Sequence, residues 1–172
     1  MEIEELRTSW DELGRRDPLW AILTKASARG NRWNRDEFFK TGEYEIKSVL
    51  DYVDRMNFKC ARERALDFGC GVGRLTQALC EYFRECWGVD IARSMIHLAE
   101  QYNQYADRCN YRINESDDLK LFEDNWFDCI YTNLVLQHIH PRFTRKYIGE
   151  FLRTLKPAGA AIFAVPSDPI VL

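Results

Sequence analysis

The chain has 172 residues, of which 46% are hydrophobic and 30% charged, and its formal net charge at pH 7 is -3. This length and composition are typical of one globular domain with a sizeable core, and they exclude a disordered or fibrous protein. The negative charge argues against a nucleic-acid-coating protein, and no apolar run approaches the length of a bilayer span. We therefore expect a cytoplasmic protein that has neither a membrane nor a nucleic acid as its partner.

The first third of the sequence predicts short helices. Ser9 has the pattern of a helix N-cap, with Glu12 three residues later, and Gly14 predicts an early end to that helix. Pro18 predicts the first turn of a second helix, where a missing N–H group is harmless. A basic run with one tryptophan follows, which either solvates the surface or forms a lid over a site; it contains Lys25, Arg29, Arg32, Trp33 and Arg35.

The next segment predicts a break near Gly42. Asn34 is expected to cap a segment that ends there, and apolar residues at helical spacing predict a separate helix from about Gly42 to Met56. We therefore divide the chain into an N-terminal helical extension or lid, residues 1–42, and a main domain, residues 43–172.

Beyond residue 63 the sequence alternates between strand and helix patterns with short connections. This alternation predicts an α/β fold: a doubly wound, Rossmann-like, mostly parallel sheet with helices on both faces. Strands are expected near residues 64–69, 85–90, 110–114, 127–133 and 160–165, and Pro157-Ala158-Gly159 is expected to turn the last helix into the fifth strand. Six cysteines without a C-x-x-C pair are expected to be reduced, buried thiols.

A glycine-rich turn follows the first strand. Ligands of such sheets bind at the carboxyl ends of the strands, so the turn and Asp90, which ends the second strand, are the natural site. Asp90 either accepts ribose hydroxyls or caps the next helix. The spacing is G-x-G-x-G rather than the G-x-G-x-x-G of nicotinamide and flavin domains, and Asp67 precedes it where a pyrophosphate would be repelled. Asp67 instead suits a ligand with an ammonium group.

Several motifs together resemble the class I S-adenosylmethionine-dependent methyltransferases. The three motifs are Leu66-Asp67-Phe68-Gly69-Cys70-Gly71-Val72-Gly73-Arg74, Gly88-Val89-Asp90-Ile91-Ala92-Arg93-Ser94-Met95 and Asn114-Glu115-Ser116-Asp117-Asp118-Leu119. Residues 126–139 are similar to the family's fourth strand and the loop after it, and residues 152–160 to the turn into its fifth strand. The resemblance covers residues 65–165.

This resemblance implies S-adenosylmethionine as the cofactor and gives roles to the motif residues. The glycine turn would receive the methionine end of the cofactor. Asp90 would hold the ribose, and Ile91 would lie against the adenine face. Glu115 and Ser116 would line the adenine edge, with Asp117 in reserve. The full set of expected cofactor-binding residues is Asp67, Gly69, Cys70, Gly71, Gly73, Asp90, Ile91, Met95, Glu115, Ser116 and Asn133.

The implied reaction is an in-line displacement at a methyl group on a sulfonium, which requires mainly positioning. Asn133 is expected to face the methionine end of the cofactor. His138 is the candidate catalytic base, because the ordinary pKa of histidine is near 6.5, although local packing explains this residue equally well. His138 and His140 have no third ligand at a suitable spacing, so we expect no metal site.

One feature departs from the family pattern. The complete fold carries two further strands, which this sequence lacks, and the fifth strand would form an apolar sheet edge. A truncated chain, a homodimer through that edge and a fragment without its acceptor site are the three explanations. The expected function is methyl transfer from S-adenosylmethionine to a small-molecule acceptor. The alternatives are a cofactor-binding module without catalysis and, less favoured, an NAD-dependent oxidoreductase.

Overall fold

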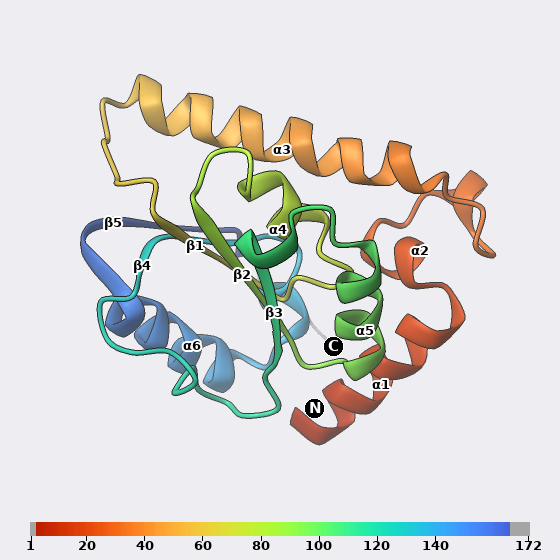
Figure 1. The fold of residues 1–172 in the computed structure, drawn as a ribbon. Helices are drawn as coiled ribbons and strands as arrows, with labels where there is room; N and C mark the ends of the chain where they lie inside the picture. Colours follow the sequence, from red (N-terminus) through yellow and green to blue (C-terminus); the bar gives the residue numbers. More distant parts are fainter. Residues whose placement is uncertain (1–2, 166–172) are drawn as a thin grey trace.

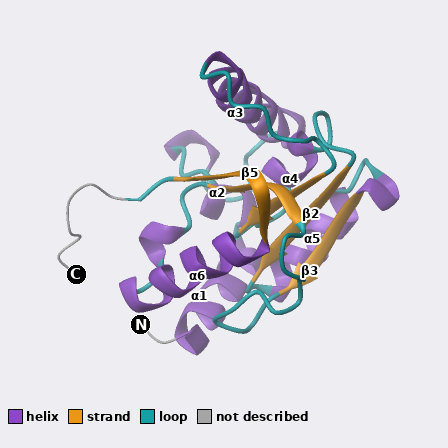
Figure 2. Cartoon of the chain, turned by 90° about the vertical axis from the view of Figure 1, so that its left-hand side faces the viewer, coloured by secondary structure: helices purple, strands orange, loops and turns teal. Residues whose placement is uncertain are grey.

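The computed structural model describes residues 3–165 as a twisted layer of strands with helices on both sides (Figure 1; Figure 2). The helices are α1 (Ile3–Arg16), α2 (Pro18–Ile22), α3 (Arg35–Arg55), α4 (Arg74–Leu79), α5 (Arg93–Tyr102) and α6 (Pro141–Thr154). The strands are β1 (Arg64–Phe68), β2 (Glu85–Asp90), β3 (Cys109–Ile113), β4 (Phe127–Thr132) and β5 (Leu155–Phe163). Within residues 3–165, no helix combines the length and the apolar character needed to cross a membrane.

The strands form one parallel sheet in the order β3-β2-β1-β4-β5. Ala65 of the central strand β1 pairs with Cys86 of β2 on one side and with Cys129 of β4 on the other. The chain runs from β1 outward to β3 and then returns to β4, so the strand order reverses between β1 and β4. The predicted doubly wound α/β fold is confirmed, and no antiparallel strand follows β5 within the described residues.

Successive side chains of β1 face opposite sides of the sheet, as the period of a strand requires. Ala65 packs in a core under α3, α4 and α5, whereas Leu66 packs in a second core under α6. Figure 1 shows α3 and α4 above the strands and α6 below them. The first core holds the five buried cysteines, and all six thiols are free, with Cys60 half-buried; the buried ones are Cys70, Cys80, Cys86, Cys109 and Cys129.

The first helix differs from the sequence-based prediction. Ser9 lies inside α1, where its hydroxyl donates to the carbonyl oxygen of Glu5, so the predicted N-cap at Ser9 is wrong. Gly14 does not end the helix early but is buried within it. The absence of a side chain lets α1 pack closely on α5, because an added Cβ would lie 2.3 Å from the Ser94 hydroxyl. The prediction that Pro18 begins α2 is confirmed.

The predicted break at Gly42 is also wrong. Asn34 caps α3 as expected, accepting the N–H of Glu37 at 3.0 Å, but the helix then continues without interruption from Arg35 to Arg55. Gly42 lies on the buried face of α3, where an added Cβ would lie 2.5 Å from the carbonyl oxygen of Arg74. The glycine therefore permits close packing of α3 on α4 and ends nothing.

The fifth strand begins earlier than predicted. β5 starts at Leu155, so Pro157-Ala158-Gly159 lies within the strand and is not a turn that precedes it. The pairing of β4 with β5 shifts register between Phe127 and Cys129, and Ala158 has a φ of 63°. A bulge thus absorbs the proline and the glycine, which are the residue types that strands tolerate at such irregularities.

Candidate functional site

A glycine turn connects β1 to α4 at the carboxyl end of the sheet. Gly69, Gly71 and Gly73 all have positive φ values, of 75°, 52° and 82°, a region that residues with a Cβ rarely adopt. The N–H groups of Gly69 and Cys70 donate to the carbonyl oxygen of Val89, at 2.8 and 2.9 Å. The end of β2 therefore holds the turn, next to the point where the strand order reverses.

Asp90 connects this turn to α5. One of its carboxylate oxygens accepts the N–H of Gly71 at 2.8 Å, and the other accepts the N–H of Ala92 at 2.9 Å. Burial raises the pKa of Asp90, while these backbone N–H groups oppose that rise. Each carboxylate oxygen has a second lone pair, so the two backbone contacts leave capacity for further donors. Beyond it, Ile91 is half-buried and Met95 is buried in the core around α1 and α2.

Asp67 lies buried beneath the turn. Its side chain accepts the hydroxyl of Thr76 at 2.7 Å, and the residue is only 1% exposed. Burial raises the pKa of Asp67 to about 7, more than the Thr76 hydroxyl and the Arg74 charge lower it. Cys70, in the turn itself, is a buried thiol whose pKa burial also raises. The turn therefore has an acidic group directly below it.

A polar network beside the turn was missed by sequence reasoning. Glu45 of α3 accepts hydrogen bonds from the Tyr131 hydroxyl and from the Asn133 amide, both at 2.8 Å. The same carboxylate pairs with the buried guanidinium of Arg74 at 2.9 Å. The only signals for it in the sequence were an acidic residue next to the buried stripe of α3 and an arginine directly after the third glycine. Asn133, predicted to face a cofactor, contacts Glu45 in this structure.

The remaining predicted residues lie on two loops. Glu115 follows β3 and pairs with Arg93 at 2.9 Å and with Arg7 of α1 at 3.1 Å. Ser116 accepts the Tyr147 hydroxyl with its carbonyl oxygen. His138 belongs to the 3-10 turn Leu136–His138 after β4, and burial lowers its pKa. α1 contacts both Glu115 and His138, through Arg7 and Trp10 respectively.

The N-terminal helices cover this region. Trp10 of α1 packs edge-on against His138, with ring centroids 5.5 Å apart. Asp11 accepts the N–H of Ser94 at 2.8 Å, and Figure 1 shows α1 alongside α5. Ile22 of α2 packs closely against the turn: a Cβ added at Gly71 would lie 2.5 Å from the Ile22 Cδ1 atom. Residues far apart in the sequence therefore close the carboxyl end of the sheet.

Titratable groups gather around the turn, but they do not form a metal centre. Within residues 3–165, no group of three or more histidine, cysteine, aspartate or glutamate side chains is arranged to hold a metal ion. The carboxylates of Glu45, Asp67 and Asp90 instead bind hydroxyl, amide, guanidinium and backbone N–H donors.

A family model described as "Methyltransferase domain" matches residues 66–163. The uncharacterized methyltransferase YcgJ of Bacillus subtilis is 31% identical over 115 residues, which are 64% of this chain and 45% of that protein. The ubiquinone biosynthesis O-methyltransferase of Xanthomonas oryzae is 28% identical over 139 residues, or 80% of this chain and 57% of that protein. The chain thus spans about half the length of these relatives.

Solved structures agree on the fold. Phosphoethanolamine N-methyltransferase 1 of Haemonchus contortus, in complex with phosphoethanolamine and S-adenosylhomocysteine, has a TM-score of 0.72 at 18% identity. The match covers 94% of this chain and 31% of that one, and at this identity it shows the fold alone. Together with the family match across more than half of the sequence, these likenesses mean that the chain belongs to the class I S-adenosylmethionine-dependent methyltransferases.

Proposed function

We propose that this chain binds S-adenosylmethionine at the glycine turn and transfers its methyl group to a small-molecule acceptor. The observation that carries the proposal is the position of Asp90, whose carboxylate accepts the N–H of Gly71 in the turn and the N–H of Ala92 before α5. A carboxylate anchored in this way has a fixed direction and spare lone pairs for the two hydroxyls of a ribose.

The other predicted residues supply complementary surfaces for the same cofactor. Ile91, which is half-buried, would provide apolar contact for the adenine, and the loop with Glu115 and Ser116 would line its edge. Met95 is 1% exposed and packs in the core beneath. Asp67, below the turn, would favour the ammonium of the methionine end. When bound, S-adenosylmethionine supplies an electrophilic methyl group, so the protein needs chiefly to hold the acceptor in line. These roles rest on the family and on position.

His138 is proposed as the base for an acceptor that must lose a proton. Burial lowers its pKa, which favours the neutral ring that can accept a proton. It lies beside Trp10, in a 3-10 turn directly after β4. The relatives are named as O- and N-methyltransferases, so the acceptor atom stays open.

The alternative is a module that binds the cofactor without catalysis. Two observations favour it: Asn133 donates a hydrogen bond to Glu45, and Trp10 packs edge-on against the ring of the exposed His138. The side chain expected at the methionine end of the cofactor and the one expected on the acceptor side thus both make internal contacts. Turnover assays with hydroxyl, amine and carboxyl acceptors distinguish the two functions, because a module would bind S-adenosylmethionine and methylate none of them.

Calorimetry with S-adenosylmethionine, S-adenosylhomocysteine and NAD tests the proposal. We expect the first two to bind and NAD to bind far more weakly. Asp90→Asn, which cannot carry the negative charge, should weaken the binding of S-adenosylhomocysteine at least tenfold, or by about 1.4 kcal/mol. Asp51→Asn, on the exposed side of α3, is the matched control. An unchanged affinity of Asp90→Asn would remove Asp90 from the ribose, and folded protein that binds neither sulfur compound would overturn the function.

Two further proposals concern a lid over the cofactor and a homodimer. The predicted N-terminal lid, residues 1–42, would cover the cofactor, and the close approach of Ile22 to Gly71 supports this proposal. A homodimer through the β5 edge is supported by the exposure of Phe163 at the end of the strand, 38%, and of Val165 two residues beyond it, 53%. Sedimentation that gives a monomer at all concentrations would exclude the dimer. The division at residue 42 and the cytoplasmic location stay predictions.

A further inference from the structure

Asn133 directly follows β4, at the edge of the sheet where ligands of such folds bind. Val135, two residues later, lies against the glycine turn, because a Cβ added at Gly69 would lie 2.5 Å from the Val135 Cγ2 atom. Leu134 between them has a φ of 61°, in the left-handed region that a leucine rarely adopts. The chain therefore bends sharply at this point, and Asn133 lies beside the turn.

Glu45 of α3 fixes which end of the Asn133 amide faces the protein. The Glu45 Oε1 atom accepts the Asn133 Nδ2 group at 2.8 Å and the Tyr131 hydroxyl, also at 2.8 Å. An ionised carboxylate accepts hydrogen bonds and donates none, so it excludes the reversed amide, in which two oxygen atoms would face each other. The Oδ1 atom of Asn133 therefore points away from Glu45.

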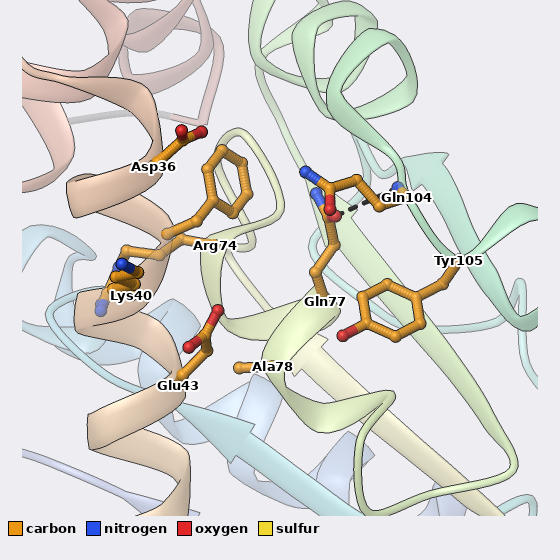
Figure 3. A pocket seen from close by; sticks show the side chains of 9 residues that line it. Asp36, Lys40, Glu43, Arg74, Gln77, Ala78, Gln104 and Tyr105 are labelled. Carbon is orange, nitrogen blue, oxygen red and sulfur yellow. Dashed lines mark hydrogen bonds between the residues drawn. The ribbon is translucent and has the colours of Figure 1, made fainter.

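Arg74 holds the other oxygen of the same carboxylate. Its guanidinium donates to Glu45 Oε2 at 2.9 Å and to the Thr41 hydroxyl at 3.2 Å, and its side chain is only 4% exposed. Figure 3 shows this side chain extending from α4 toward α3, beside the cavity between the two helices. A guanidinium donates and cannot accept, so it keeps Oε2 on its own side and leaves Oε1 for Asn133.

The outward end of the Asn133 amide is available to a ligand. Within residues 3–165 its Oδ1 atom makes no hydrogen bond, and it is not one of the buried atoms that lack a partner. The atom therefore keeps accessible surface beside the glycine turn. A carbonyl oxygen has two lone pairs and only accepts, so it suits an ammonium group, which only donates.

We propose that Glu45 is a positioning residue, which turns the Asn133 carbonyl oxygen toward the ammonium at the methionine end of the cofactor. Glu45 acts through Asn133 and does not itself contact the cofactor. The inference rests on the proposed binding of S-adenosylmethionine, and it extends that site to α3, outside the residues 66–163 that the family model matches. The contact between Glu45 and Asn133 prepares the site and does not obstruct it.

Glu45→Gln tests the direction of the amide, because it exchanges one carboxylate oxygen for an NH₂ group. Arg74 can only donate, so the glutamine turns its oxygen toward Arg74 and its NH₂ group toward Asn133. Asn133 then accepts with Oδ1 and presents its own NH₂ group to the ligand, where a second donor meets the ammonium. Adding Asn133→Asp restores an acceptor on both sides, because an aspartate accepts from the glutamine and from the ligand.

Calorimetry with the whole chain compares S-adenosylhomocysteine with its deamino analogue, in which a hydrogen replaces the ammonium group. The wild type should bind S-adenosylhomocysteine at least about tenfold more tightly than the analogue. Glu45→Gln should lower this ratio to about threefold or less, and the double variant Glu45→Gln/Asn133→Asp should restore it to about tenfold. Glu43→Gln removes the same charge from an exposed position of α3 and should keep the wild-type ratio.

A wild-type ratio that Glu45→Gln leaves unchanged would overturn the role of Glu45. A double variant whose ratio is no higher than that of Glu45→Gln would overturn the direction of the amide, and equal binding of both compounds by the wild type would overturn recognition of the ammonium. If Glu45→Gln does not fold, Asn133→Leu, which keeps the pair of Glu45 with Arg74, must lower the ratio, and an unchanged ratio there overturns the proposal. Folded wild type that binds neither compound would instead overturn the cofactor site itself.

Discussion

At the scale of single residues, Asp67 makes stability depend on pH. Its ordinary pKa of 3.8 rises to about 7 in the fold, so between these values the folded state keeps a proton that the unfolded chain has lost. The stabilisation from this proton is fully present below about pH 4 and disappears as the pH rises to 7. We expect the wild type to lose up to about 1.4 kcal/mol of unfolding free energy per pH unit over this range, relative to Asp67→Asn.

Urea unfolding at pH 5 and at pH 8 measures this difference. The asparagine side chain cannot titrate, so the urea midpoint of Asp67→Asn should change less between pH 5 and pH 8 than that of the wild type. Asp107→Asn, at an exposed position, serves as the control and should follow the wild type. If Asp67→Asn and the wild type change in parallel, the Asp67 carboxyl titrates normally and its burial has no consequence.

Glu45 carries a second prediction at this scale. It is the carboxylate partner of the buried Arg74, and it also accepts from Tyr131 and Asn133. Glu45→Leu leaves a buried cation without its counter-charge, which should lower the unfolding free energy by about 3–5 kcal/mol. Adding Arg74→Met should recover part of this loss, because the unpaired charge is removed. Chemical denaturation of both single variants and the double variant measures the coupling, and strictly additive losses would contradict it.

The residues of the site differ in how far the sequence could predict them. The position of Asp90 beside the glycine turn was predictable, because one strand–helix–strand unit fixes its distance from that turn. Its contact with a ribose stays a prediction. Glu45 was not, because its partners Tyr131 and Asn133 lie 86 and 88 positions further along the chain. No local pattern encodes a contact over that separation. The engagement of Asn133 by Glu45 was missed for the same reason.

At the scale of elements, a glycine can end an element or lie within one, and the sequence does not distinguish these two roles. Gly42 was interpreted as a helix end, yet it lies in the middle of α3 against the Arg74 backbone. Pro157 and Gly159 were interpreted as a turn, yet β5 takes them up in a bulge. The positions of the first four strands were predicted to within a residue, because apolar runs between turn residues are local signals. Packing glycines and bulges depend on the neighbouring element.

Two glycine-to-alanine substitutions test this distinction. An alanine is favoured over glycine in a helix by about 1 kcal/mol, so Gly149→Ala in α6, where a Cβ meets nothing within 4 Å, should stabilise the protein by up to that amount. Gly42→Ala should instead destabilise it by about 1–3 kcal/mol, because the new Cβ overlaps the backbone of α4. Thermal unfolding of both variants measures the difference. Stabilisation by both would mean that α3 can move away from α4 at little cost.

At the scale of the whole molecule, the position of the N-terminal helices decides how the site opens. Individual signals in the sequence suggested a lid, but nothing local indicated that Ile22 would rest on Gly71 or that Asp11 would bind the start of α5. The doubly wound parallel sheet was predictable from alternating elements, because parallel strands with helical crossovers allow few arrangements. The docking of α1 has no such rule, since it depends on side chains from three distant segments.

Asp11 therefore tests whether α1 and α2 open separately from the sheet. Its carboxylate accepts the N–H of Ser94 at 2.8 Å, and the Ser94 hydroxyl donates back to the Asp11 carbonyl oxygen at 2.9 Å. Asp11→Ala removes the first bond, which at about 1–2 kcal/mol corresponds to roughly tenfold faster exchange through local opening.

Hydrogen exchange read by mass spectrometry should show that increase across residues 3–22 and unchanged protection in β1 and β2. Glu12→Ala removes only an exposed pair with Arg16 on the same helix and should leave both regions unchanged. S-adenosylhomocysteine, if it binds beneath the helices, should restore protection to residues 3–22 of Asp11→Ala. An equal rise of exchange in α1 and in the sheet would instead mean that the helices unfold only with the core. A segment that unfolds only in this way cannot serve as a lid for the cofactor.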